Sequence, residues 1–209
     1  MKSVRSLMSA LILSGSALAA LPAGAATITG GTTAVTLTSA PSLASLGLSV
    51  SPTGTATVAT DASGLPVVTF PITGGTTAGG NAIIEHNGSG LLFSNGGGAT
   101  LGIGNFRIDT AAALITGDAS ANGSALGIVP LFKLAPGAQL LLTAEAAGAF
   151  QTVFNADVVE NTIVGTAAVN PIAAGVPEPA TWSLMILGFG AVGAAMRRRT
   201  SVRVRFAHA

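Results

Sequence analysis

Short runs that alternate apolar and small polar residues, separated by glycine-rich breaks, restrict what the middle of this chain can fold into. Residues 33–38, 46–50 and 55–59 alternate with the period of two that is typical of half-buried β-strands. Breaks such as residues 95–98 and 122–123 contain Asn and Gly, which accept the positive φ of tight turns. Many short strands joined by such turns favour a β-sandwich or a barrel-like domain.

The remaining part of this region follows the same pattern, with one exception. Residues 144–153 favour a helix, because Thr143 is a suitable N-cap and Phe150 and Phe154 lie four positions apart. We therefore predict a mostly β, Gly-rich domain over residues 26–165 with one short helix near its C-terminal end, followed by a linker over residues 166–176. Further strands are expected at residues 66–72, 82–86, 91–94, 99–109, 113–117, 125–134 and 139–143.

Residues 1–25 have the three parts of a secretory signal peptide. Lys2 and Arg5 precede an apolar run over residues 7–18, and Ala23-Gly24-Ala25 forms a small-residue cleavage site. Ala17-Leu18-Ala19 is the alternative site. The run is too short for a comfortable membrane span of about 20 residues. We expect an N-terminal signal helix that engages the Sec translocon and is removed by signal peptidase, so that the protein leaves the cytoplasm.

The C-terminal segment, residues 177–205, combines three features of different chemistry. An extended motif over residues 177–182 contains Pro177, Glu178, Pro179 and Trp182, and an apolar run over residues 182–196 follows it. We expect this run to form a transmembrane helix, although its 15 residues cover only about 22 Å of a core about 30 Å thick. A basic cluster over residues 197–205 should stay cytoplasmic. It begins with Arg197, Arg198 and Arg199.

This C-terminal segment resembles the PEP-CTERM sorting signal in its Pro-Glu-Pro-x-x-Trp variant. Ser183 stands where that family usually has Ala, and residues 200–209 are longer than its usual tail. The resemblance implies processing by the membrane enzyme exosortase in a Gram-negative bacterium. It also implies transient anchoring in the inner membrane, then a place on the cell surface or in the extracellular matrix, beside exopolysaccharide and biofilm.

Charge and cysteine content exclude several classes of function. Only 8% of all residues are charged, and residues 26–176 hold two basic and seven acidic ones, a net charge of −5. This acidic balance offers no basic patch for nucleic acid. The chain has no Cys, which excludes disulfides, thiol nucleophiles and Cys-zinc sites.

The blocks at residues 70–75, 84–91, 105–109 and 142–145 resemble the HtaA-type domain of bacterial surface proteins, which is β-rich. Its best-known members bind haem through a Tyr, often supported by a His. This chain has no Tyr, and all four Met residues lie in the terminal segments. His86 is therefore the candidate ligand-binding residue, and its other interpretation is a turn residue beside Asn87-Gly88. We expect no cofactor and no metal.

No catalytic constellation is apparent. His86 is the single imidazole of residues 26–176, and no Gly-x-Ser-x-Gly elbow or phosphate loop occurs. Arg107 and Asp109, two apart on one strand, are expected to form a surface ion pair. We expect the Phe side chains to form the core: Phe70, Phe93, Phe106, Phe132, Phe150 and Phe154.

The sequence therefore predicts an exported, non-enzymatic surface or extracellular-matrix protein without catalytic residues. The alternative is a surface module of HtaA-like type that binds a small ligand, either haem or a glycan.

Overall fold

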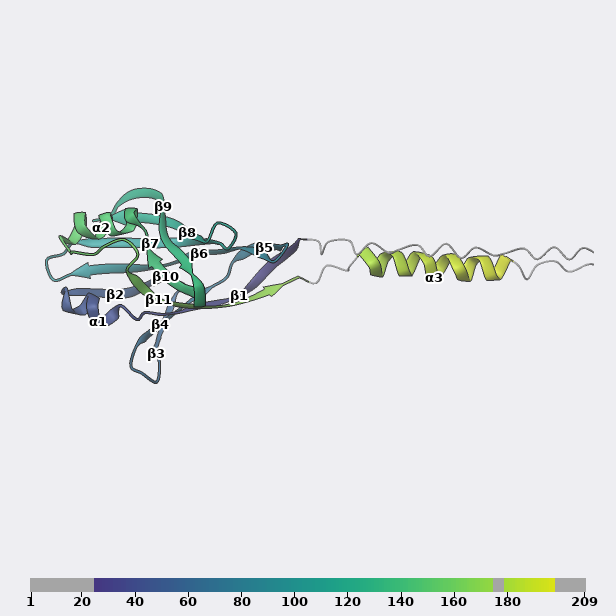
Figure 1. Cartoon of the computed structure of the whole chain (residues 1–209), viewed down its shortest axis with the longest axis horizontal. Helices are drawn as coiled ribbons and strands as arrows, with labels where there is room; N and C mark the ends of the chain where they lie inside the picture. The colour runs from purple at the N-terminus through teal and green to yellow at the C-terminus, as the bar shows by residue number, and fades with distance from the viewer. Residues whose placement is uncertain (1–24, 175–178, 198–209) are drawn as a thin grey trace, which may run out of the picture.

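Antiparallel strand pairing organises the chain, and the mostly β fold expected from the sequence is confirmed (Figure 1). The computed structural model describes residues 25–174 and 179–197. Its strands are β1 (Ala26–Thr36), β2 (Leu48–Gly54), β3 (Thr57–Thr60), β4 (Pro66–Pro71), β5 (Gly74–Ala78), β6 (Asn81–Asn95), β7 (Thr100–Asp109), β8 (Leu114–Ala121), β9 (Ser124–Ala135), β10 (Gln139–Leu142) and β11 (Ile163–Ala173). Its helices are α1 (Ala40–Ser45), the 3₁₀ helix η1 (Pro136–Ala138), α2 (Ala144–Phe154) and α3 (Pro179–Arg197).

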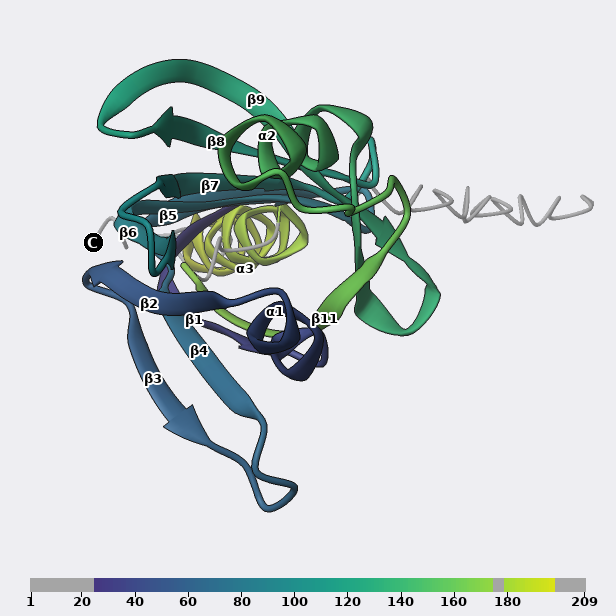
Figure 2. The ribbon, with the colours of Figure 1, turned by 90° about the vertical axis from the view of Figure 1, so that its left-hand side faces the viewer.

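Strand β1 joins the two ends of the main series of strands. Strands β5 to β11 pair in chain order, each antiparallel to the next. The start of β1 pairs with β5, and most of its length pairs with β11. The sheet therefore curves round and its pairings return to β1, as the end-on view in Figure 2 shows. Strands β4 and β3 continue from β1, and β2 pairs with β6.

Bulges in β6 and β7 keep the large apolar residues on the inner side of the curved sheet. In β7, Leu101 and Ile103 are buried before Asn105, whereas Phe106 and Ile108 are buried after it. Asn105 has a positive φ of 49°, and the β7–β8 register shifts there. Side chains alternate between the two faces along a strand, so one extra residue is needed if the buried side chains change from odd-numbered to even-numbered positions.

A matching irregularity in β6 lies directly opposite. Register is lost between His86 and Gly90, so that residues 87–89 face Asn105 alone. The Gly88 N–H donates to Oδ1 of Asn105 at 2.7 Å, which satisfies part of the bulged backbone. Beyond it, Gly90 pairs with Gly104, and the two backbones approach closely.

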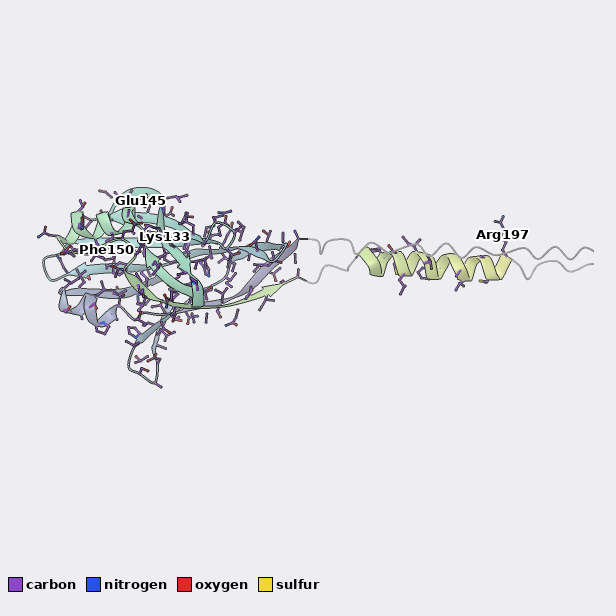
Figure 3. All side chains as sticks on the ribbon, in the orientation of Figure 1. Lys133, Glu145, Phe150 and Arg197 are labelled. Atoms are coloured by element: carbon purple, nitrogen blue, oxygen red, sulfur yellow. The ribbon has the colours of Figure 1, made fainter. Side chains whose placement is uncertain are left out.

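Helix α2 packs against strands β7 and β9, on the face of the sheet that carries Phe93 and Leu101. Oγ1 of Thr143 accepts the Ala146 N–H at 3.2 Å, which confirms the expected N-cap. The small residues Ala146 and Ala147 are buried and allow close approach, while Phe150 meets Phe93 edge-to-face with ring centroids 4.9 Å apart. Figure 3 labels Phe150 and Glu145 on this helix.

Helix α3 lies apart from the strands in Figure 1, and Figure 3 shows Arg197 at its far end. Its start at Pro179 agrees with the tolerance of a helix's first turn for proline. Its described side chains are exposed, among them Leu184 (76%), Leu187 (74%) and Phe189 (71%). A search of residues 25–174 and 179–197 finds no helix with both the length and the apolarity to cross a membrane.

Three expectations for the domain are wrong. Residues 166–173 are not a linker, because they belong to β11 and pair with β1. Asn87-Gly88 is a bulge within one long strand rather than a turn between two strands. Residues 74–75 lie between the strands expected at residues 66–72 and 82–86, where no strand was predicted, but they begin β5. The short helix α1 was also not foreseen. The signal peptide over residues 1–25 lies outside the described residues except for Ala25.

Gly90 tests the close approach of β6 and β7. A Cβ at this position would lie 2.3 Å from the Ile103 carbonyl oxygen, which is backbone and cannot rotate away. We expect Gly90→Ala to lower the free energy of unfolding by about 2 kcal/mol or more. The control Gly148→Ala in α2 meets no atom within 4 Å and should raise it by up to about 1 kcal/mol. Urea denaturation measures both, and equal effects would contradict the close approach.

Candidate functional site

His86, the candidate ligand-binding residue, lies on β6 immediately before the bulge, and its side chain is only 1% exposed. Its Nε2 is hydrogen-bonded to Oγ1 of Thr33 on β1 at 2.8 Å. Nδ1 is buried and has no hydrogen-bond partner. The Phe70 ring meets the imidazole edge-on at 6.3 Å. His86 is therefore an interior residue of a strand, and its interpretation as a turn residue is wrong.

Burial keeps this imidazole neutral. Removal of the ring from water lowers the pKa of His86 below its ordinary value of 6.5. The backbone carbonyl of Phe106 lies near the ring and offsets part of this effect, although it forms no hydrogen bond of good geometry with Nδ1. The uncharged ring can donate to Thr33 or accept from it, depending on the tautomer.

The imidazole lines an apolar cavity of about 250 Å³ inside the curved sheet. Most strands of the sheet contribute to its wall: Thr33 and Val35 from β1, Phe70 from β4, Ile84, His86, Leu91 and Phe93 from β6, Phe106 and Ile108 from β7, Ile115 from β8, Phe132 and Leu134 from β9, Leu140 from β10, and Val164, Ala167 and Val169 from β11. The cavity thus depends on the pairing of β1 with β11.

A cavity of this size is unusual for a protein interior. Native cores have few voids larger than a water molecule. Empty space inside a core costs stability at roughly 24 cal/mol per Å³. Since whole domains are stable by only about 5–15 kcal/mol, an occupant that fills such a space would contribute to the stability of the fold. The cavity is therefore the strongest candidate for a ligand site among the described residues.

A second hollow, of about 580 Å³, lies over the bulge and is more polar. Asn105 and Asp118 line it and are engaged with one another, since Nδ2 of Asn105 donates to Oδ2 of Asp118 at 2.7 Å. Ser89 also lines it, and its hydroxyl donates to the His86 carbonyl at 3.2 Å. These polar groups stabilise the bulge.

The structure also places the charged and aromatic residues that were singled out in the sequence. Arg107 and Asp109 form the expected ion pair at 3.6 Å. A second pair, unforeseen, joins Lys133 to Glu160. Five of the six Phe side chains named as core are buried, and Phe154 packs against the core. Within residues 25–174 and 179–197, no three His, Asp or Glu side chains gather closely enough to hold a metal ion.

The sorting residues are only partly described. Pro179 and Trp182 lie in the first turns of α3, and Trp182 is 53% exposed. Arg197 ends this helix. Pro177, Glu178, Arg198 and Arg199 lie outside the described residues.

Comparisons with known proteins agree with both resemblances. Residues 175–199 match the PEP-CTERM protein-sorting motif, so the assignment made from Pro177, Glu178, Pro179 and Trp182 is confirmed. The fold is similar to the crystal structure of the C-terminal domain of HtaA from Corynebacterium glutamicum, with a TM-score of 0.54 and 14% identity over 71% of this chain and 99% of that one. At this identity the likeness concerns the fold alone. No curated protein matches the chain.

The hydrogen bond between Thr33 and His86 is tested by an isosteric substitution. Thr33→Val removes the hydroxyl and leaves Nε2 buried without a partner, which should lower the free energy of unfolding by about 1–3 kcal/mol. The neighbouring Thr32 is exposed on the same strand, so Thr32→Val should change it by less than about 0.5 kcal/mol. Denaturation curves of the two variants give the comparison, and an equal effect would contradict the bond's role.

The neutral state of His86 predicts a pH dependence of stability. Its pKa is lower in the folded chain than in the unfolded one, so the unfolded state binds more protons as the pH falls. The free energy of unfolding should be constant near pH 7 and fall below about pH 6.5, by at most about 1.4 kcal/mol per pH unit. His86→Phe should remove this slope between pH 5.5 and 7. A stability that rises as the pH falls would contradict a buried neutral imidazole.

Proposed function

We propose that this chain is an exported, non-enzymatic protein of the cell surface or extracellular matrix of a Gram-negative bacterium, and that exosortase processes it through its C-terminal motif. The sorting-motif match at residues 175–199 carries the proposal. The signal peptide predicted at residues 1–25 supplies the first step, entry into the Sec translocon and removal by signal peptidase. The precursor is then held at the inner membrane by its C-terminal segment until it is cut.

The exposed apolar side chains of α3 support a processed tail. Leu184, Leu187 and Phe189 are each more than two-thirds exposed, and soluble proteins rarely leave such a contiguous apolar surface uncovered. A membrane or a processing enzyme would cover it before cleavage. After cleavage, the strand domain would remain without this segment.

We further propose that the mature domain accompanies exopolysaccharide. Support comes from the sorting signal, which resembles signals found with exopolysaccharide production, and from the acidic, charge-poor exported region. The exopolysaccharide component is tested separately, by asking whether the protein leaves the matrix fraction when polysaccharide synthesis is deleted.

A second candidate function, a small-ligand module, is favoured by the position of His86 in the cavity wall. Haem fits this wall poorly, because Nε2 is engaged with Thr33 and the iron would require one of the usual ligands. A glycan fits it poorly as well, because its hydroxyl groups would lie against apolar side chains. The cavity therefore argues for a ligand of another class.

Mass spectrometry of the protein from its native host tests the sorting proposal. We expect a mature species that begins near Ala26, ends near Val176, and is absent from a strain without exosortase. Glu178→Gln should impair processing, because the motif loses its carboxylate. The control Glu145→Gln makes the same change at an exposed site on α2 and should leave processing intact. A species that keeps residues 197–209 in both strains would overturn the proposal.

A further inference from the structure

The cavity inside the curved sheet is the feature of this molecule that sorting does not explain. Side chains from strands β1, β4 and β6 to β11 line it, and it is partly open to the surface where Thr110 and Ala138 are exposed. Its volume of about 250 Å³ is larger than that of apolar cavities of about 150 Å³, which stay dry and admit benzene or xenon. An apolar cavity of this size therefore favours a nonpolar ligand, which gives up little hydration when it binds.

The polar side chains of the wall are hydrogen-bonded within the protein, and the surface they leave to the cavity is apolar. Thr33 and His86 bind one another through Oγ1 and Nε2. Thr110 exchanges hydrogen bonds with the Ala82 backbone, accepting from its N–H at 2.7 Å and donating to its carbonyl at 3.2 Å. The unpartnered Nδ1 of His86 is itself buried. The surface that a ligand would meet is thus hydrocarbon.

Charge is also absent from the wall. None of the described residues that line the cavity is Lys, Arg, Asp or Glu, and His86 is held neutral by burial. A carboxylate or an ammonium group inside the cavity would lose its hydration without gaining a partner, which is strongly unfavourable. This excludes charged ligands from the interior.

We propose that this cavity binds a small, neutral, chiefly hydrocarbon molecule or an alkyl chain, a ligand class distinct from haem and from glycans. The proposal goes beyond sorting and stands independently of it, because it concerns the folded domain alone. The His86–Thr33 pair closes one part of the wall, while the apolar side chains of β6, β9 and β11 surround the chain of the ligand.

Titration of the purified protein with straight-chain 1-alkanols from hexanol to dodecanol tests the proposal. We expect binding to tighten by about fourfold per methylene until the cavity is filled, since each buried CH₂ contributes about 0.8 kcal/mol. Carboxylates and alkylammonium ions of the same length should bind at least about tenfold more weakly. Isothermal titration calorimetry gives these affinities.

A pair of neighbouring alanines on β11 locates the binding site. Ala167 lines the cavity, whereas Ala168 is exposed on the opposite side of the strand. Ala167→Leu should fill part of the void and weaken alkanol binding at least about tenfold, while Ala168→Leu should leave the affinity unchanged. In the wild-type protein, intermolecular NOEs should join alkanol methylenes to methyl groups of Val35 and Val169, which keeps the test independent of how well the variant folds.

Three results would overturn the proposal. The first is no binding of any alkanol up to its solubility limit. The second is equal affinity for alkanols and for carboxylates of the same length, because that would require a polar or charged wall. The third is NOEs to residues outside the cavity, or an equal loss of binding in Ala167→Leu and Ala168→Leu, because binding would then lie elsewhere.

Discussion

The pairing of β1 with β11 is the contact on which the rest of the domain depends. It joins residues about 140 positions apart and brings the last strand of the domain beside the first. Without it, the sheet would have two open edges and the inner side chains would face water. With it, the apolar faces of the strands turn toward a common interior, and a cavity remains where they do not meet.

The two facing bulges determine which side chains reach that interior. The bulges at Asn105 in β7 and at residues 87–89 in β6 lie opposite one another, and each shifts the alternation of its strand by one residue. As a result, the paired residues His86 and Phe106 are buried at one end of the bulge, and the paired residues Leu91 and Ile103 are buried at its other end. His86 is the last inward residue before the bulge in β6. Its burial next to Thr33 is therefore a consequence of strand register, and the same register places one hydrogen-bonded polar pair in a mostly apolar wall.

Sequence reasoning succeeded where a residue's local pattern decides its structure. The alternation of residues 33–38 and the N-cap Thr143 act over a few positions, and both are confirmed. The sequence pattern led to a wrong prediction for β11, because its small residues and Pro171 resemble a linker. Pro171 is tolerated there because this end of β11 pairs with β1 alone, where Gly31 allows close approach.

The site was harder to predict than the strands. The sequence singled out His86 but gave no signal for Thr33 as its partner, because the two residues lie 53 positions apart and meet only when β1 and β6 are both placed. The Phe side chains were correctly expected in the core, yet no pattern shows that they leave a space between them. A cavity is a property of how volumes fit together, which a single sequence does not display.

Diffraction from crystals of the domain under xenon pressure tests whether the curved sheet holds a dry apolar cavity. Xenon enters apolar cavities and is seen by its strong scattering. We expect a xenon site between Val35, Phe93 and Phe132, with no ordered water against His86. Ordered water bound to Nδ1 of His86, or side chains collapsed into the space with no xenon, would contradict it.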